Sequence, residues 1–261
     1  MKPLIYTNPG HSDRDPGAVG YEQERRLNVA VTNYQNEYLL ANYECEVKSN
    51  PGNVSDLSVI CAEANKLGAA LFVSNHFNAG GGDGYECYVY SEARRPLGQI
   101  FEKHVKAAGQ NSRGVKVNPK YIVLNSTNMP AVLNEGAFVD NKKDIQDWND
   151  DAELKAMGIA YAKAAAEYLK LEPKTAPVEP AAPETVTVKL EVLKKGSKGE
   201  QVEALQRLLK THGYGLGSNN PFDGDFGSMT DTAVRLYQKH NNLTQDGVVG
   251  EKTWKKLLGI K

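Results

Sequence analysis

Cysteine is scarce in this sequence of 261 residues, which has only Cys45, Cys61 and Cys87. An odd number of cysteines in a chain of this length argues against a disulfide-stapled secreted scaffold and favours a reducing compartment. No Cys-x-x-Cys pair occurs, so metal ligation by cysteine is not indicated. We expect all three cysteines to be small core or strand residues.

Long apolar runs and an excess of charge are also missing. The N-terminus, MKPLIYTNPGH, lacks the apolar stretch of a signal peptide, and no run is long enough to span a bilayer. The net charge of -1 gives no indication of a nucleic-acid or anionic-membrane partner. The sequence therefore predicts no membrane insertion and no nucleic acid, and retention in the cytoplasm until another factor releases the protein.

Proline is concentrated in one segment. Residues 172–185, EPKTAPVEPAAPET, contain four prolines and no large apolar residue except Val178. Such a composition is typical of a semi-rigid extended linker. We predict a first domain over 1–171, a linker over 172–189 and a second domain over 190–261.

The first domain alternates between strand-like and helix-like patterns. Apolar residues recur at helical spacing from Leu27 to Tyr38 and from Leu57 to Leu67, and 93–109 and 151–170 are further helix candidates. The β-branched and aromatic runs predict strands at 4–6, 44–49, 70–75, 84–90, 120–125 and 130–136. This alternation predicts an α/β fold with a sheet covered by helices.

The second domain contains an internal repeat. The segments DGDFGSMT (223–230) and DGVVGEKT (246–253) share the frame Asp-Gly-x-x-Gly-x-x-Thr, and each leads into an apolar helix face. Asp-Gly forms a tight turn, and the residues after the second glycine can start a helix. A third amphipathic helix, 199–213, completes a small three-helix module.

Three chemically capable side chains follow predicted strands. His11 lies in the turn-rich stretch TNPGHSDRDPGAVG, where a lone histidine would most often be a surface-loop residue. His76 follows the apolar run Leu71–Val73, and Glu135 ends a third apolar run. Because ligands bind beside the carboxyl ends of strands in open α/β sheets, a shared cleft is expected there.

Two histidines, one carboxylate and an open position for water form a catalytic zinc set. We predict Glu24 as the carboxylate, at the start of a helix 13 residues after His11. Glu22 is the alternative, but Glu24 is better placed relative to Leu27 and Val31, which define the buried face of that helix.

These motifs resemble the zinc-dependent N-acetylmuramoyl-L-alanine amidases of bacterial cell-wall lysis, over essentially the whole first domain. PGHSDRDPGAVG resembles their metal loop, ERRLNVAV their ligating helix, AALFVSNHFNAGG their second histidine strand and PAVLNEGAFVDN their final segment. The resemblance implies an open mixed sheet flanked by helices and a Zn²⁺ ion held by His11, Glu24 and His76. It also implies that Glu135 is the general base that cleaves the amide between the lactyl group of N-acetylmuramic acid and L-alanine.

Three residues depart from the family pattern. Phe77 replaces a small residue after the second histidine, Asn75 precedes that histidine, and Ile60 lies where an arginine is usual. We expect these changes to alter pocket shape or packing rather than the metal set. Asn78 and Asn141 match common family positions and are interpreted as orienting or turn residues.

The second domain is similar to the peptidoglycan-binding module found beside wall hydrolases, which implies attachment to the bacterial cell wall. We expect Tyr237 and Trp254 to be core residues, and His104, His212 and His240 to have only polar roles on or at the ends of helices. The leading hypothesis is a phage-type endolysin that accumulates in the host cytoplasm and needs a separate holin for release. The alternatives are a bacterial autolysin or sporulation amidase, a non-catalytic wall-binding protein, and a different zinc hydrolase.

Overall fold

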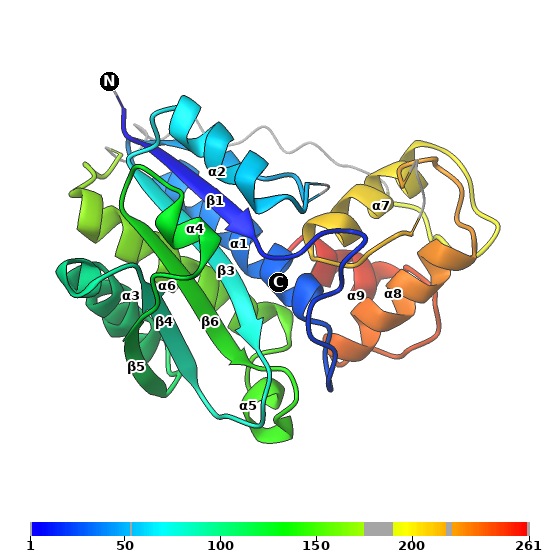
Figure 1. Cartoon of the computed structure of the whole chain (residues 1–261). Helices are drawn as coiled ribbons and strands as arrows, with labels where there is room; N and C mark the ends of the chain where they lie inside the picture. The colour runs from blue at the N-terminus through cyan, green and yellow to red at the C-terminus, as the bar shows by residue number, and fades with distance from the viewer. Residues whose placement is uncertain (1, 53, 175–189, 218–220, 260–261) are drawn as a thin grey trace. The chain divides into compact units, whose positions relative to one another are not determined.

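A computed structural model of the chain describes residues 2–52, 54–174, 190–217 and 221–259 (Figure 1). The chain divides into two units, residues 1–175 and 176–261, with separate hydrophobic cores. Most of the predicted linker falls on 175–189, outside the described residues, so its boundaries stay a prediction.

Six strands form one sheet in the first unit, in the order β2-β1-β3-β6-β4-β5. Neighbouring strands are parallel except β4 and β6, which are antiparallel. The predicted open mixed sheet is confirmed. The strands are β1 (Leu4–Pro9), β2 (Glu46–Ser49), β3 (Leu71–Asn78), β4 (Tyr85–Val89), β5 (Ser112–Val117) and β6 (Ala131–Phe138).

One predicted strand is wrong and one observed strand was not predicted. The run 120–125 is helical, because Ile122–Asn125 forms the short helix α4, with Val123 and Leu124 buried in the core. A short apolar run has no periodicity that separates a buried strand from a buried helix turn, so its packing partners decide. Strand β5 escaped prediction because it is a sheet-edge strand of sequence SRGVKV with no fully buried residue.

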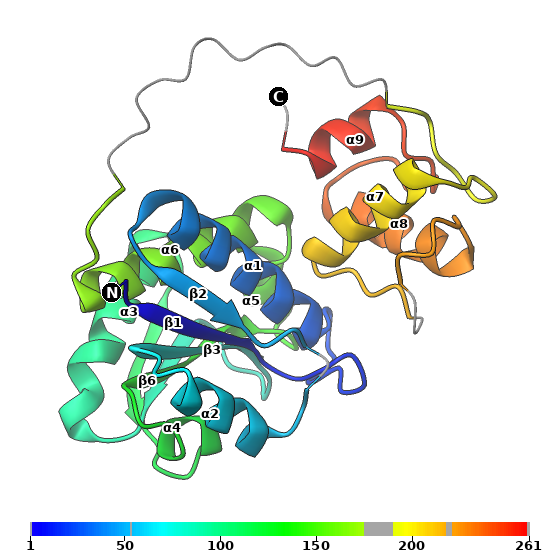
Figure 2. The ribbon, with the colours of Figure 1, turned by 90° about the horizontal axis from the view of Figure 1, so that it is seen from above.

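Helices cover the two faces of the sheet unequally (Figures 1 and 2). One face packs against α1 (Glu24–Asn42), α3 (Arg95–Ala107) and α6 (Asp151–Leu169). The other packs against α2 (Leu57–Lys66) and α4. The predicted helices at 93–109 and 151–170 are thereby confirmed, and the short η1 (Glu92–Arg94) and α5 (Lys142–Gln146) complete the unit.

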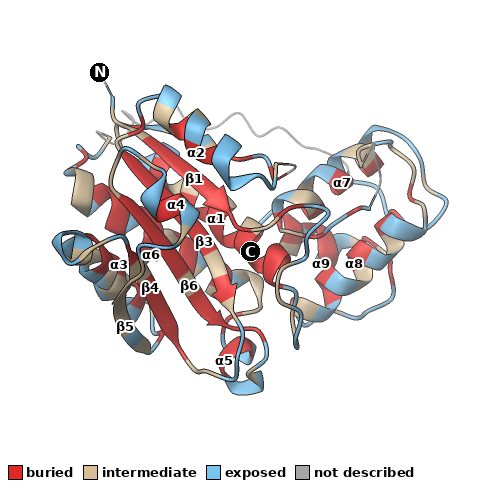
Figure 3. Ribbon diagram, viewed as in Figure 1, coloured by how far each residue is buried: buried red, intermediate tan, exposed pale blue. Residues whose placement is uncertain are grey.

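The face beneath α2 and α4 changes character along the strands. Tyr6, Phe72 and Leu133 are buried against these helices. Figure 3 shows that most of the central strands are buried. Alternate residues lie on the same face of a strand, so His76 and Glu135 lie further along this same face, toward the carboxyl ends of β3 and β6. This face of the sheet is therefore apolar beneath α2 and α4 and polar toward the carboxyl ends of β3 and β6.

The second unit contains α7 (Glu200–Thr211), α8 (Ser228–His240) and α9 (Glu251–Leu257), as predicted. Its repeat is held by two buried glutamines in equivalent positions. The Gln206 amide bonds to Asp223, Thr230 and the backbone of residues 224 and 225, and the Gln238 amide bonds to Asp246, Thr253 and the backbone of residues 247 and 248. Each Asp-Gly turn is therefore fixed to a helix by a side-chain amide.

Several predictions about the core are confirmed. Tyr237 and Trp254 are buried, and so are the three cysteines, all of which are free thiols. His104 contacts Glu167, His212 contacts the carbonyl of Leu257 and His240 contacts Tyr214, each at the end or on the surface of a helix. Among the described residues, no helix has the length and apolar character needed to cross a membrane.

Candidate metal centre and active site

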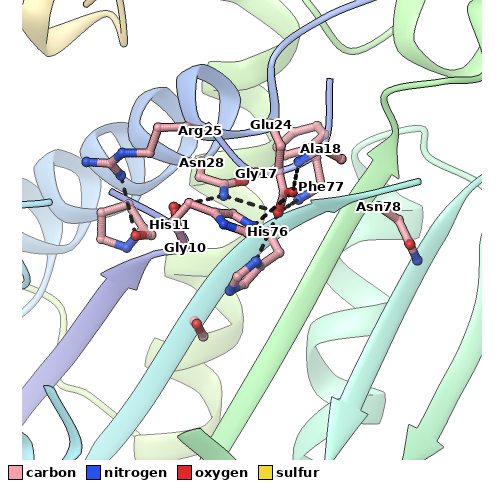
Figure 4. A network of polar contacts seen from close by, with 12 residues as sticks. Gly10, His11, Gly17, Ala18, Glu24, Arg25, Asn28, His76, Phe77 and Asn78 are labelled. Carbon is pink, nitrogen blue, oxygen red and sulfur yellow. Dashed lines mark hydrogen bonds and ion pairs between the residues drawn. The ribbon is translucent and has the colours of Figure 1, made fainter. Parts of the chain in front are cut away.

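His11, Glu24 and His76 converge from three elements of the first unit. His11 follows β1, Glu24 is the first residue of α1, and His76 lies on β3 (Figure 4). Glu24 Oε2 lies 3.0 Å from His11 Nε2, and Glu24 Oε1 lies 3.0 Å from His76 Nδ1. One nitrogen or oxygen atom from each residue falls within 4.8 Å of the others, which defines a candidate metal centre.

Glu24 is the buried member of this group, with 5% of its surface exposed. Its carboxylate also accepts hydrogen bonds from the backbone N–H of Ala18 (2.9 Å) and Phe77 (3.4 Å) and from the side chain of Asn28 (3.4 Å). Burial raises the pKa of Glu24, but the contacts with His11 and His76 outweigh it and leave the pKa well below its usual range. The residue is a fixed negative charge beside two imidazoles.

The imidazole of His11 is oriented by a second carboxylate. Its Nδ1 lies 2.8 Å from Asp15 Oδ2, which leaves Nε2 facing Glu24. The contact with Glu24, reinforced by Asp15, raises the pKa of His11 to about 9. His11 also has a φ of 66°, in the left-handed region that non-glycine residues rarely adopt. Backbone strain of this kind is concentrated at functional sites.

Two glycines make room for the group. A Cβ atom on Gly10 would lie 2.1 Å from Cε1 of the His76 ring. A Cβ on Gly17, whose φ is 68°, would lie 2.6 Å from both Glu24 Oε2 and His11 Cδ2. Close packing around the three side chains therefore requires glycine at both positions.

The donor set fits zinc. Two imidazole nitrogens and a carboxylate oxygen are the ligands of a three-residue catalytic zinc site with an open fourth position. With metal–ligand distances near 2.1 Å, tetrahedral ligand atoms are about 3.4 Å apart, which lies between the 3.0 Å contacts and the 4.8 Å limit of this group. The side chains of His11 and His76 are 26% and 19% exposed, so the centre is open to solvent.

Glu135 lies beside this centre on β6. It pairs with His76 on the parallel strand β3 and with Glu86 on the antiparallel strand β4, so the three side chains form a row across the sheet. Its Oε2 is buried and has no hydrogen-bond partner within the described part of the chain. Burial, followed by the negative charges of Glu24 and Glu86, raises the pKa of Glu135 well above its usual value.

The structure brings together all four residues that the sequence analysis selected. The alternative ligand, Glu22, contacts Arg26 instead and is not part of the group. Two neighbouring carboxylates were not identified from the sequence: Asp15, four residues after His11, and Glu86, on β4. The sequence signal for Asp15 was its position in the same turn-rich stretch, whereas Glu86 is brought close only by strand pairing.

The side chains that depart from the family pattern are not part of the candidate centre. Phe77 and Asn75 point to the opposite face of β3 from His76, where Phe77 is in the core and Asn75 bonds to Thr32 and Gln35. Ile60 is a buried residue of α2 and packs in the core beneath that helix. These changes therefore affect packing, which is one of the two effects expected for them.

Asn78 and Asn141 have orienting contacts. Asn78 donates to Glu86 at 3.2 Å and accepts from the backbone N–H of Ala79. Asn141 caps α5 by accepting from the backbone N–H of Lys143 and Asp144. Both contacts agree with turn or orienting roles.

The fold is that of cell-wall amidase catalytic domains. The catalytic domain of CwlV, an N-acetylmuramoyl-L-alanine amidase from Bacillus (Paenibacillus) polymyxa var. colistinus, superimposes with a TM-score of 0.62 and 28% sequence identity. The match covers 66% of this chain and all of that one.

Sequence comparison gives the family. Residues 5–167, more than half of the chain, match the N-acetylmuramoyl-L-alanine amidase family, and residues 198–257 match the putative peptidoglycan binding domain. The endolysin of Bacillus phage SPP1 is 30% identical over 76% of this chain and 79% of its own length. The amidase CwlM of Bacillus licheniformis is 32% identical over 66% of this chain and 71% of its own length. The chain belongs to the N-acetylmuramoyl-L-alanine amidase family and has amidase activity on peptidoglycan, with a C-terminal peptidoglycan-binding domain.

Proposed function

We propose that the first unit is a zinc-dependent amidase in which His11, Glu24 and His76 hold Zn²⁺ and Glu135 is the general base. The observation that carries this proposal is the convergence of two imidazoles and a buried carboxylate, with a second carboxyl group on the adjoining strand. The bond cleaved is the amide between the lactyl group of N-acetylmuramic acid and L-alanine, which is the bond expected for an N-acetylmuramoyl-L-alanine amidase.

Each residue has a defined part in the reaction. A zinc ion bound by the three ligands would polarise the scissile carbonyl and lower the pKa of an attacking water molecule. Glu24 supplies the negative charge of the ligand set, and Asp15 fixes the His11 ring so that Nε2 faces the centre. Glu135 takes the proton of the attacking water and delivers it to the departing amine. Its raised pKa suits a group that must both accept and return a proton.

The test is end-group analysis of digested peptidoglycan with wild type, zinc-depleted wild type and Glu135→Gln. We expect new L-alanine amino termini without new reducing sugar ends in wild type only. The Glu135→Gln variant should lose about 10²–10⁴-fold in kcat, the usual contribution of a general acid–base group, and keep its zinc content.

A matched control is Glu37→Gln, because Glu37 is an exposed carboxylate on the other side of α1 from the buried face. It should retain wild-type activity. New amino termini from other residues of the peptide would show that the enzyme cleaves a different bond. Full activity of Glu135→Gln would contradict the base assignment.

We also propose that the protein acts as a phage-type endolysin that accumulates in the host cytoplasm and reaches the wall through holes made by a separate holin. The similarity to the SPP1 endolysin over most of its length supports this role. The sporulation-specific amidase of Bacillus subtilis, 29% identical over 64% of this chain, supports the bacterial alternative. Expression in a host bacterium separates them: an endolysin should lyse cells only after the membrane is permeabilised, whereas lysis without permeabilisation would favour an exported amidase.

A further inference from the structure

The row of polar side chains formed by His76, Glu135 and Glu86 lies on the sheet face that also carries α2 and α4. Beyond Glu135 and Glu86, this row continues to two cations. Glu86 pairs with Glu135 across β4 and β6, and β5 lies on the far side of β4. From β5, Arg113 Nε approaches Glu86 Oε1 at 2.6 Å and Lys116 Nζ approaches the same atom at 2.5 Å. The row therefore runs from the candidate metal centre, through two carboxyl groups, to a pair of basic side chains.

The Glu86 carboxylate has several hydrogen-bond and ion-pair partners. Its side chain is 4% exposed and also accepts from the Tyr88 hydroxyl (2.7 Å) and the Asn78 amide (3.2 Å). Burial raises the pKa of Glu86, but hydrogen bonds from Lys116, Arg113 and Tyr88 lower it further than burial raises it, so the carboxylate is ionised. One negative charge faces two positive charges, and a single cation would have neutralised it. The pair therefore carries a surplus positive charge.

The two cations keep donors available to a ligand. The side chains of Arg113 and Lys116 are 44% and 39% exposed. Arg113 uses only Nε on Glu86, and its two terminal nitrogens have no hydrogen-bond partner among the described residues. Its guanidinium lies over the Phe138 ring at 5.4 Å, and Lys116 Nζ lies over the Tyr88 ring at 5.6 Å. These contacts hold both side chains in place before a ligand arrives.

We propose that Arg113 and Lys116 form a subsite for a carboxylate on the second residue of the peptide that leaves, in the reaction proposed above. The inference rests on that proposed function. Strands are about 4.8 Å apart, so Glu86 is roughly 10 Å from His76, two strands away. An extended peptide advances about 3.3 Å per residue, so two residues span about 7 Å and a side-chain carboxylate on the second residue reaches this distance. A guanidinium with two free terminal nitrogens matches a carboxylate in bidentate geometry.

Two soluble substrates test the subsite. Both are N-acetylmuramoyl-L-alanyl peptides, identical except that the second residue carries a carboxylate in one and a carboxamide in the other. Wild type should cleave the acid with about 10-fold higher kcat/KM than the carboxamide, mainly through KM, because the cations bind the ground state as well as the transition state. In Arg113→Gln/Lys116→Gln the ratio should fall to about 1.

The control variant is Arg94→Gln/Lys106→Gln, which removes the same charge from two exposed residues of η1 and α3. Its ratio should stay near 10. Arg113→Gln alone, in which Lys116 still pairs with Glu86, keeps the test available if the double variant fails to fold. It should show an intermediate ratio.

The outcomes separate this inference from the proposed function. Equal cleavage of acid and carboxamide by wild type would overturn the subsite alone. The double variant could instead lose activity equally on both substrates and keep the ratio, or change only the pH profile of kcat. Either result would make the two cations positioning residues for Glu86 and would also overturn the subsite. No cleavage of either substrate by wild type would overturn the proposed function and the subsite together.

Discussion

The backbone at His11 is held in a conformation that its side chain makes costly. Its φ of 66° is tolerated by glycine and strains most other residues. The contacts of its ring with Glu24 and Asp15 hold the residue in place. A proposed metal ligand on a strained turn is therefore a place where function and local stability oppose each other.

Comparison of His11→Gly with His11→Ala isolates this strain. Both variants lose the same ring contacts, so their difference reflects only the backbone. We expect the glycine variant to be about 1 kcal/mol more stable than the alanine variant, opposite to the order in a helix. Urea unfolding of the metal-free proteins measures the difference. Equal stability, or a more stable alanine variant, would show that residue 11 does not hold a left-handed backbone in solution.

The titration of His11 gives a second prediction at this scale. Its pKa is raised on folding from 6.5 to about 9, mainly by Glu24, so its pairing contributes stability that is fully present below about pH 6.5. That contribution is lost as the pH rises through about 9. The free energy of unfolding of the zinc-free protein should therefore fall over this range, by at most about 1.4 kcal/mol per pH unit for one proton.

The matched variant is His11→Gln, which has no titrating group at this position. Its unfolding free energy should lack this part of the slope, as measured by denaturant unfolding in chelator at pH 6.5, 7.5 and 9. If wild type and variant had parallel pH profiles, the raised pKa of His11 would be contradicted.

At the scale of elements, the site depends on how closely β1 approaches β3. The two strands are paired from Ile5 to Pro9, and Gly10 follows directly, against the ring of His76. A methyl group on Gly10 would enter that ring and displace the imidazole. We expect Gly10→Ala to weaken zinc binding by at least 10-fold, because a ligand at the wrong distance contributes little.

Competition with a colourimetric zinc chelator measures that affinity. Gly215→Ala is a suitable control, since Gly215 has no positive φ and a Cβ there would meet nothing within 4 Å. Its zinc affinity should be unchanged. Wild-type affinity in Gly10→Ala would mean that the His76 ring is not confined by this strand end.

Local patterns in the sequence identified most elements, and the errors have a common physical cause. Strands β3 and β6 are buried on both faces and read as apolar runs, and α1 and α2 show helical spacing. The helix at 122–125 and the edge strand at 112–117 lack such a signal, because their structure is set by tertiary partners.

The candidate site follows the same division. His11, Glu24, His76 and Glu135 could be selected because each lies beside a strand or helix end with a local pattern. Glu86 could not, because its closeness to Glu135 follows from the β4–β6 pairing, which no local pattern specifies. The catalytic and metal roles of the four selected residues stay predictions that the experiments above test.

At the scale of the whole molecule, the chain combines a catalytic unit with a wall-binding unit. Each unit has its own core, so residues 1–174 should fold without the remainder. Tethering to an insoluble polymer raises the local concentration of substrate without changing the chemistry at the active site. Removal of the second unit should therefore affect wall digestion and soluble-substrate cleavage differently.

We expect residues 1–174 to digest isolated cell walls about 10- to 100-fold more slowly than the full chain at low enzyme concentration. The same fragment should cleave a soluble muramoyl peptide at the full-chain rate. Turbidity loss of walls and chromatographic release of peptide measure the two activities. Residues 190–261 added as a separate chain should not restore wall digestion, because only the covalent tether couples binding to catalysis. Restoration in trans would mean that the second unit acts by altering the wall, and an equal loss on both substrates would mean that it supports the fold of the catalytic unit.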